Sequence, residues 1–249
     1  MLALATVFLL LTTTGWTVHR HQGREVSPKE AALSAWLRAS AGGHRLPPPD
    51  SPPSVIARFF ATLTAWQRNR LAEKYPLVVG NLDGAPVSLR YRANRLSLRK
   101  ALSAERARRR TADLTEEGRR QSKRRIIRLK SLLEPGRQIL SFDPTGRGQV
   151  AEVLGDLDSA RRISVVVPGV DTDLLTFERT KKPWQAPAGM ARALYRAART
   201  AAPNTPAAVI AWADYRAPVG LGMDAATAMR AADGAARLRR MVEALPARA

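Results

Sequence analysis

Hydrophobic and polar positions divide the chain into four stretches. Residues 1–18 contain no charged side chain, and residues 19–54 are polar and proline-rich around one short helical pattern. Over residues 55–135 apolar side chains recur at helical spacing, and from residue 136 onward short aliphatic runs alternate with alanine-rich helical patterns. The pattern predicts an N-terminal anchor or signal segment, a linker with a short helix, a helical region with a basic helix, and the N-terminal part of an α/β domain.

The first half of the chain is predicted to be helical. Ser27, Pro28 and Glu30 have the spacing of a capping box with proline at the first helical position, which predicts a short helix through Ala39. The proline-rich stretch 41–53 is predicted to be a linker or an extended surface strap. Further helices are expected over residues 55–74, 90–102 and 104–133. The turn formers between residues 80 and 86 predict either a structured double turn or a loop that shapes a pocket.

The second half is organised around Ile163 to Val170, where a β-branched run predicts a buried central strand and Pro168-Gly169 predicts a tight turn. A hairpin is expected before it, because Asp-Pro and Gly separate two apolar runs. A strand over residues 207–212 and a final helix from residue 223 to 245, with Asp224 as N-cap, are expected after it. The predicted fold class is α/β, with a hairpin followed by parallel strands and crossover helices. The strands are expected at residues 138–142, 149–154, 163–167 and 207–212, and the helices at residues 188–200 and 223–245.

The N-terminal stretch bears on localisation. Residues 1–18 include the apolar run Val7 to Leu11. The whole 18-residue stretch is long enough for a short membrane span or the apolar core of a signal peptide. Because positive charges follow this stretch and do not precede it, we favour a membrane anchor, with export by a secretory signal or a soluble core helix as alternatives. The chain has no cysteine, so it forms no disulfide and has no thiolate nucleophile.

A net charge of +20 suggests an anionic partner, but 34 of the 41 basic residues are arginine, and we favour coding bias with a solvated surface as its cause. Eleven of the basic residues lie between Ser103 and Lys130 against four acids. No aromatic side chain interleaves them, so the stacking platform for nucleic acid is missing. An anionic membrane surface is therefore the preferred partner of this basic helix, and nucleic acid is not expected.

The turn after the predicted central strand is the candidate chemical site. In open α/β sheets ligands bind beyond the carboxyl ends of the strands, and Gly169 lets a backbone amide approach a ligand closely. We assign Gly169 and Val170 as oxyanion-hole candidates, although plain turn geometry also explains Pro168-Gly169. Trp212 and Tyr215 are candidates for lining a pocket, with simple packing as the alternative.

Three acids near the strand ends, Asp171, Asp173 and Asp214, are expected in capping or surface roles. No histidine accompanies them and their spacing matches no metal-binding loop. Neither a metal site nor a cofactor is expected.

Several motifs in order resemble a family of actinobacterial α/β-hydrolases known only as a domain of unknown function. The resemblance covers residues from about Phe59 to Leu238 and implies a lipase- or esterase-like fold, an ester or similar acyl substrate, and a place in the cell envelope. The motifs that carry it are Gly80-Asn81-Leu82-Asp83-Gly84-x-Pro86, Asn94-Arg95, Phe142-Asp143-Pro144-x-Gly146-x-Gly148, Gly155-Asp156-Leu157-Asp158, Val167-Pro168-Gly169 and Ala211-Trp212-x-x-Tyr215-x-x-Pro218.

One part of the family pattern is missing. The family's Gly-His-Ser-Tyr-Gly nucleophile elbow is expected one strand after the final helix, but the last serine here is Ser164 and the histidines, at positions 19, 21 and 44, all come early. No residue is assigned as catalytic, and we expect this chain alone to be inactive. The absent strand is also expected to leave Ile163 to Val167 as an apolar edge that pairs with a partner. The alternative function is a non-catalytic protein that binds an anionic partner through its basic helix.

Overall fold

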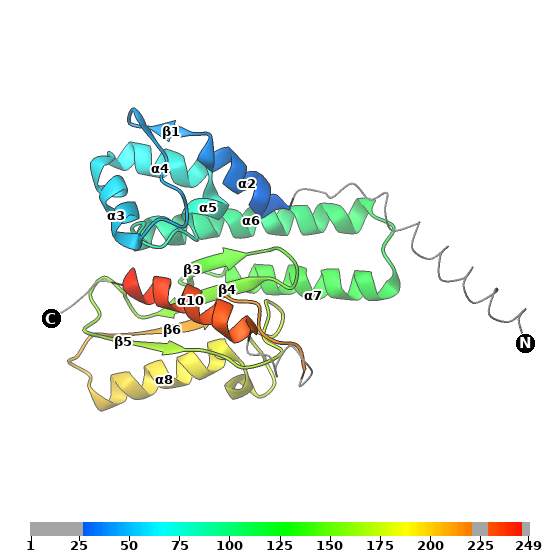
Figure 1. Ribbon diagram of the computed structural model, residues 1–249. Helices are drawn as coiled ribbons and strands as arrows, with labels where there is room; N and C mark the ends of the chain where they lie inside the picture. Colours follow the sequence, from blue (N-terminus) through cyan, green and yellow to red (C-terminus); the bar gives the residue numbers. More distant parts are fainter. Residues whose placement is uncertain (1–26, 221–228, 246–249) are drawn as a thin grey trace, which may run out of the picture.

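The computed structural model describes residues 27–220 and 229–245, and its centre is a mixed four-stranded sheet (Figure 1). The strand order is β3-β4-β6-β5. Strand β4 runs antiparallel to both β3 and β6, whereas β5 and β6 are parallel. The fold class is therefore α/β as expected, and the strands are β3 (Gln138–Asp143), β4 (Gln149–Leu154), β5 (Arg162–Val166) and β6 (Ala207–Ala213).

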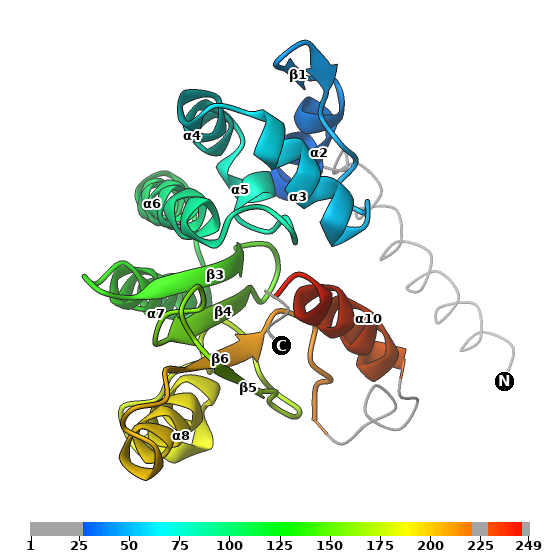
Figure 2. The ribbon, with the colours of Figure 1, turned by 90° about the vertical axis from the view of Figure 1, so that its left-hand side faces the viewer.

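Helices cover both faces of this sheet (Figure 2). Helices α7 (Glu116–Leu132) and α8 (Pro187–Ala201) lie on one face, where Phe142 and Val209 are among the buried side chains. Helix α10 (Met229–Glu243) lies on the other face and buries Met241 beside Trp212. Short alanine side chains on α8 and β6 let the helix approach the strand closely.

A bundle of helices lies beyond β3. Its core is built around Trp36, Ile56 and Phe60, all fully buried. The expected capping box is present, with Glu30 N–H donating to Ser27 Oγ and Ser27 N–H donating to Glu30 Oε2. The bundle consists of α2 (Pro28–Leu37), α3 (Pro53–Thr62), α4 (Ala65–Lys74), α5 (Pro76–Val79) and α6 (Val87–Thr111).

The single helix predicted over residues 55–74 is wrong. The chain is extended at Leu63 and Thr64, and α4 starts anew with a capping box between Thr64 and Gln67. The expected linker at 41–53 is also more ordered than predicted. It contains a small antiparallel hairpin of β1 (Ser40–Ala41) and β2 (His44–Arg45), it buries Leu46, and Trp36 Nε1 donates to Pro47 O at 2.7 Å.

The predicted boundary between two helices at Ser103 is wrong as well. Helix α6 continues through Ser103 to Thr111, and α7 begins only after Thr115, whose hydroxyl accepts from Gly118 N–H. The basic residues therefore divide between two packed helices joined by a short turn (Figure 1). Two of the arginines serve the fold, because Arg125 pairs with Glu105 and Arg128 pairs with Glu178. The single cationic helix face that was expected does not form.

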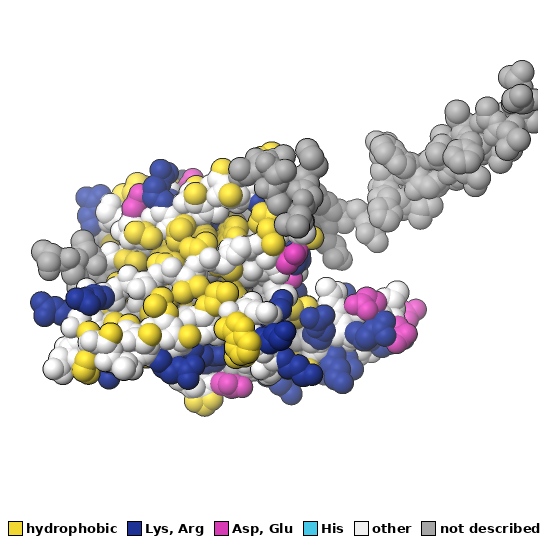
Figure 3. All heavy atoms as spheres, turned by 90° about the horizontal axis from the view of Figure 1, so that it is seen from below, with side chains coloured by type: hydrophobic (Ala, Val, Ile, Leu, Met, Phe, Trp, Pro, Cys, Tyr) yellow, Lys and Arg dark blue, Asp and Glu magenta, His cyan; other side chains and the backbone are white. Residues whose placement is uncertain are grey.

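The hairpin β3–β4, the parallel pair β5–β6 and the edge position expected for residues 163–167 are confirmed, but the burial predicted for this strand is wrong. In the described part of the chain β5 pairs with β6 alone. Its side chains are only partly covered, and Val167 just beyond it is 48% exposed. Figure 3 shows rows of hydrophobic side chains on the face that carries β5 and α8. This free edge is the feature expected for a sheet that another strand extends.

The opposite edge of the sheet, at β3, is closed by two asparagine side chains. Asn81 Nδ2 donates to Phe142 O at 2.8 Å, and Phe142 N–H donates back to Asn81 Oδ1 at 2.9 Å. From α6, Asn94 Nδ2 donates to Ile139 O at 3.0 Å and to Gly80 O at 2.8 Å. These amides bond backbone groups of an edge strand that a neighbouring strand would otherwise pair. The turn-forming stretch at residues 80–86 thus connects the helical bundle to the edge of the sheet by hydrogen bonds.

Three expectations concern residues outside the described part. The anchor or signal at residues 1–18, the Asp224 cap and the start of the final helix all lie there. Within residues 27–220 and 229–245, no helix combines the length and hydropathy that crossing a bilayer requires.

Asn94→Ala is expected to lower the free energy of unfolding by about 2–3 kcal/mol, because Ile139 O loses its side-chain donor and Gly80 O keeps only the longer bond from Arg90 Nε. Urea denaturation followed by circular dichroism measures this loss. Arg99→Ala, on an exposed position of the same helix, is the control and is expected to stay within about 0.5 kcal/mol of the parent. Equal stability of the two variants would contradict the role of Asn94 in connecting α6 to β3.

Candidate functional site

The turns that follow β3, β5 and β6 lie at the same end of the sheet. Strands β3 and β6 both run antiparallel to β4, and β5 is parallel to β6. The carboxyl ends of β3, β5 and β6 therefore lie at the same end of the sheet. A cavity of about 300 Å³ opens there. Its lining comes from all three turns and the start of α10: Thr145, Gly146, Arg147, Gly148, Gln149, Thr172, Tyr215, Arg216, Ala217, Val219 and Arg230.

Gly169 and Val170 are exposed residues in the turn after β5. Val170 is 41% exposed, and nothing lies within 4 Å of the position that a Cβ on Gly169 would take. Among the described residues, no hydrogen bond from either backbone amide to another group is present. Gly169 does not have a positive φ; the left-handed residue of this turn is Asp171, at φ 58°. The glycine is therefore not needed for the backbone conformation, and its contribution is open space beside two unbonded N–H groups.

Tyr215 fixes the direction of these amides. Its hydroxyl donates to Pro168 O at 2.7 Å and lies 3.5 Å from Gly169 O. Because a trans peptide places its C=O and N–H on opposite sides, the N–H groups of Gly169 and Val170 point away from Tyr215. Burial raises the pKa of the Tyr215 hydroxyl, so it remains a donor at neutral pH.

Trp212 holds the ring of Tyr215 in place by stacking against it. Its ring stacks on Tyr215 with centroids 5.3 Å apart and an interplanar angle of 3°. Gly234 of α10 packs so closely on the Tyr215 ring that a Cβ there would lie 2.8 Å from Cδ2. Trp212 is 1% exposed and does not line the cavity, whereas Tyr215 does. Of the two pocket candidates, Tyr215 is placed at the cavity and Trp212 positions it.

The three acids near the strand ends have structural partners. Asp171 Oδ1 accepts from Gly220 N–H, and Asp173 Oδ1 accepts from Leu175 N–H and Thr176 N–H. Asp214 Oδ2 accepts from Arg237 Nη2 at 2.7 Å. In the portion of the chain that the structure describes, no cluster of three metal-ligating side chains occurs.

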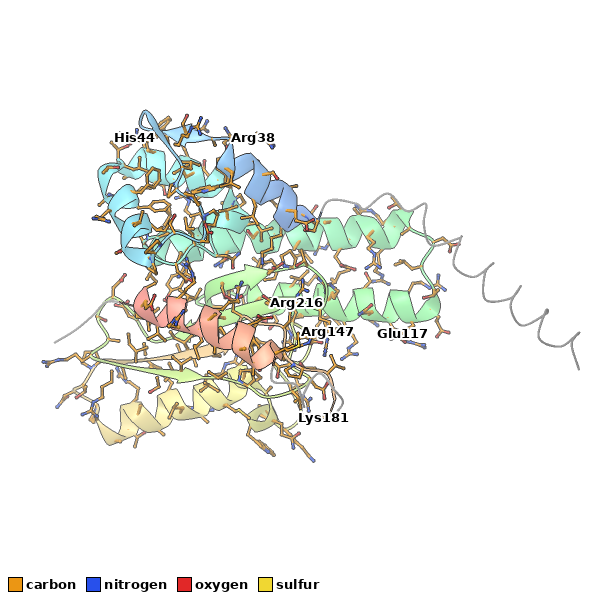
Figure 4. All side chains as sticks on the ribbon, in the orientation of Figure 1. Arg38, His44, Glu117, Arg147, Lys181 and Arg216 are labelled. Atoms are coloured by element: carbon orange, nitrogen blue, oxygen red, sulfur yellow. The ribbon has the colours of Figure 1, made fainter. Side chains whose placement is uncertain are left out.

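Among residues 27–220 and 229–245, no serine and histidine beside the turn form a nucleophile pair. Ser164 lies on β5, exposed, and His44 lies in the β1–β2 hairpin of the helical bundle. Figure 4 shows His44 at the far end of the bundle from Arg147 and Arg216, which line the cavity. The described residues thus supply backbone donors and positive charge to the site, without a serine–histidine pair.

The segment after the turn is anchored by Glu178, an acid that no local sequence pattern singled out. Its carboxylate accepts from Arg128, Arg137 and Arg192 at 2.7–2.9 Å. Burial alone would raise the pKa of this carboxyl, but Arg137 and Arg192 outweigh burial and lower the pKa to about 2. Arg137 also pairs with the buried Glu152 of β4, so the network ties the segment to the sheet. Ordering this segment limits the conformations open to the turn that precedes it.

Tyr215→Phe is expected to keep the ring stacking and lose the bond to Pro168 O, at a cost of about 1 kcal/mol in the free energy of unfolding. The amide signals of Gly169 and Val170 in ¹H–¹⁵N spectra should shift or broaden, because their peptide planes are no longer held. Tyr195→Phe is the matched control, since no hydrogen bond joins the Tyr195 hydroxyl to another described residue. If both variants leave the turn signals unchanged, Tyr215 does not position the turn.

Glu178 predicts a pH dependence of stability. Its pKa is lowered on folding, so its contribution is complete above the unfolded value near 4.5 and is lost as pH falls toward about 2. At pH 7 we expect Glu178→Gln to be less stable by on the order of 3 kcal/mol, because three arginines lose their carboxylate. The difference from the parent should shrink between pH 4.5 and 2 in urea titrations.

Glu117→Gln is the control for this titration, since Glu117 is exposed at the start of α7. It should follow the parent at every pH. A Glu178→Gln deficit that stays constant down to about pH 2 would contradict the proposed titration.

Residues 143–249 match a family model described as alpha/beta hydrolase. Two proteins of Mycobacterium tuberculosis, Uncharacterized protein MT2140 (strain CDC 1551 / Oshkosh) and Uncharacterized protein Rv2079 (strain ATCC 25618 / H37Rv), are each 30% identical to this chain over 205 residues. The match covers 70% of this chain, which spans only 30% of the length of those relatives. No solved structure matches. The family match and the observed sheet together support an alpha/beta-hydrolase-like fold for the second half of the chain.

Proposed function

We propose that these residues form the front part of a serine hydrolase that transfers an acyl group from an ester or similar small substrate to water. In this proposal the Val170 N–H, with the Gly169 N–H beside it, stabilises the negative charge that develops on the substrate's carbonyl oxygen. The observation that carries the proposal is the pair of exposed, unbonded amides at the carboxyl end of β5. Donors that are fixed before the reaction need no reorganisation when charge develops, which makes them effective in catalysis.

The position of these amides supports the assignment. In α/β-hydrolases one oxyanion donor comes from the loop after the third strand, and the other is the amide that follows the nucleophile. The turn here follows the third strand of the sheet along the chain, and it lies at the strand with the free edge. A strand that pairs in parallel with this edge would bring its own carboxyl end beside Val170.

Positive charge at the neighbouring cavity favours a substrate that is polar or anionic near the reacting carbonyl. Arg147 and Arg216 line the cavity, and Arg147 is already paired with Asp173. No cofactor takes part in this proposal. The site of action, at a membrane or in the cell envelope, belongs to the same proposal and follows from the apolar residues 1–18.

The first experiment reads the encoding DNA downstream of codon 249 in all three frames. The proposal expects a strand-like run followed by Gly-x-Ser-x-Gly, with an acid and a histidine farther on. The longest resulting chain should then react with a fluorophosphonate probe, whereas the 249 residues expressed alone should not, because they present no activated serine. If no such sequence follows, or if the longer chain is not labelled, the proposal is wrong.

Val170→Pro in that longer chain removes one N–H donor. We expect kcat for a p-nitrophenyl ester to fall by roughly 10²–10³ with little change in KM, because the lost interaction forms in the transition state. Val170→Ala keeps the N–H and is the matched control, expected to stay within a few-fold of the parent. Circular dichroism and the urea midpoint should confirm that both variants are folded. Equal activity of the two variants would exclude Val170 as a donor.

A further inference from the structure

A second and larger cavity lies on the other side of the β3–β4 turn. Its volume is about 830 Å³, within the range of roughly 300–1,000 Å³ that is typical of small-molecule sites. Five separate parts of the chain form its wall: the start of α2, the α4–α5 junction, one face of α6, the middle of α7 and the turn at residues 144–146. The turn residues Thr145 and Gly146 line both this cavity and the smaller one beside Tyr215.

The wall of the large cavity is mainly apolar. On α2, Pro28, Ala32 and Ala35 lie one helical turn apart and face the cavity, and Leu129 of α7 lies across from them. Small alanine side chains leave the space unfilled, where larger residues would close it. An apolar space of this size, open to solvent, is suited to a hydrocarbon chain.

One polar group on the wall has no partner. Ser97 of α6 is 5% exposed, and its hydroxyl oxygen is buried without a hydrogen bond in the described part of the chain. A buried hydroxyl without a partner costs free energy, and a ligand that bonds it recovers that cost. Ser97 therefore marks a point on the wall where a polar atom of a ligand is favoured.

The rim of the cavity is positively charged. Four cations line it, Lys74, Lys100, Arg108 and Arg125, against one carboxylate, Glu105. Glu105 is paired with the two arginines, at 3.3 and 3.4 Å. Neither lysine makes an ion pair with a described carboxylate, and Lys100 follows Ser97 by three residues on the same face of α6. The uncompensated charge of the rim thus lies beside the unpartnered hydroxyl.

We propose that this cavity binds a long-chain carboxylate, with the hydrocarbon chain against the apolar wall and the head group beside Ser97 and Lys100. Charge complementarity selects this occupant over the apolar residues 1–18 of the same chain, which precede the cavity-lining Ser27 in sequence and contain no carboxylate side chain. The site is separate from the turn at Gly169 and Val170. The proposal does not depend on hydrolase activity.

The test titrates the full 249-residue chain with dansylaminoundecanoic acid and follows its fluorescence. We expect saturable binding of one probe per chain and displacement by palmitate. Shortening the competing fatty acid by two methylene groups should weaken it by roughly tenfold. The methyl ester of the probe, which lacks the charge, should bind at least about tenfold more weakly.

Two matched pairs of variants locate the site. Ala104→Trp places bulk on the cavity wall from an exposed position and should abolish binding, whereas Ser103→Trp, one residue away and outside the lining, should not. The double variant Lys74→Ala/Lys100→Ala should weaken binding of the acid by roughly tenfold and leave the ester unchanged. Arg99→Ala, exposed on α6 and outside the lining, should change neither.

Three results would overturn the proposal. The first is no saturable binding, or equal binding of the acid and its ester. The second is an equal effect of Ala104→Trp and Ser103→Trp in chains that are both folded by circular dichroism. The third is binding that appears only when Leu9→Asp/Leu10→Asp is introduced, because that result identifies the chain's own apolar segment as the occupant.

Discussion

The outer edge of strand β3 has backbone groups that need hydrogen-bond partners, and the rest of the structure depends on how they are satisfied. Asn81 and Asn94 supply those partners from the helical bundle, with three hydrogen bonds to Ile139 and Phe142. Asn81 bonds both the N–H and the C=O of Phe142, because its amide carries a donor and an acceptor in one plane, and Asn94 supplies a donor to Ile139 O. The bundle and the sheet are thereby joined through the backbone of β3, and not only through apolar packing.

The two edges of the sheet are therefore different in kind. The β3 edge is covered, whereas the β5 edge has its turn held at one end by Tyr215 and no described strand beside it. Unpaired strand edges are costly for a protein in solution, so a free edge next to a positioned turn calls for a functional explanation. Pairing with a nucleophile-bearing strand explains the edge and the unbonded amides together, which is why we favour it over a surface loop.

The sequence predicted the local features well, because their causes are local. The capping box at Ser27 and Glu30 and the Asp-Pro turn between β3 and β4 act over three to six residues, and the structure contains both. The break at Thr64 was missed although Gln67 completes a capping box there, because the apolar spacing continues across it. The continuation of α6 past Ser103 was missed because the residues there are polar, and the burial of Glu105 depends on the packing of α6 against α7, where Arg125 pairs with it.

Long-range features of the candidate site were harder to predict. Gly169 and Val170 could be named from the strand and turn pattern, but the bond from Tyr215 to Pro168 joins residues 47 apart and left no local signal. The burial predicted for β5 was wrong because a β-branched run indicates a strand but not what covers its faces. Glu178 and the large cavity depend on side chains from three or more elements, so the fold was needed to find them.

The β3–β4 turn separates the two cavities, and it is fixed from several sides. Arg125 donates to Pro144 O and Gly146 O, Asp143 accepts from Thr145, and Lys29 of α2 pairs with Asp143 at 2.7 Å. Burial by itself would raise the pKa of the Asp143 carboxyl, but Lys29 and Thr145 outweigh it and hold the pKa below its usual value. Because the turn is held by charged partners on both α2 and α7, a ligand that shifts either helix would also move the wall of the smaller cavity. Binding in the large cavity and reactivity at the turn would then be coupled through this one structural element.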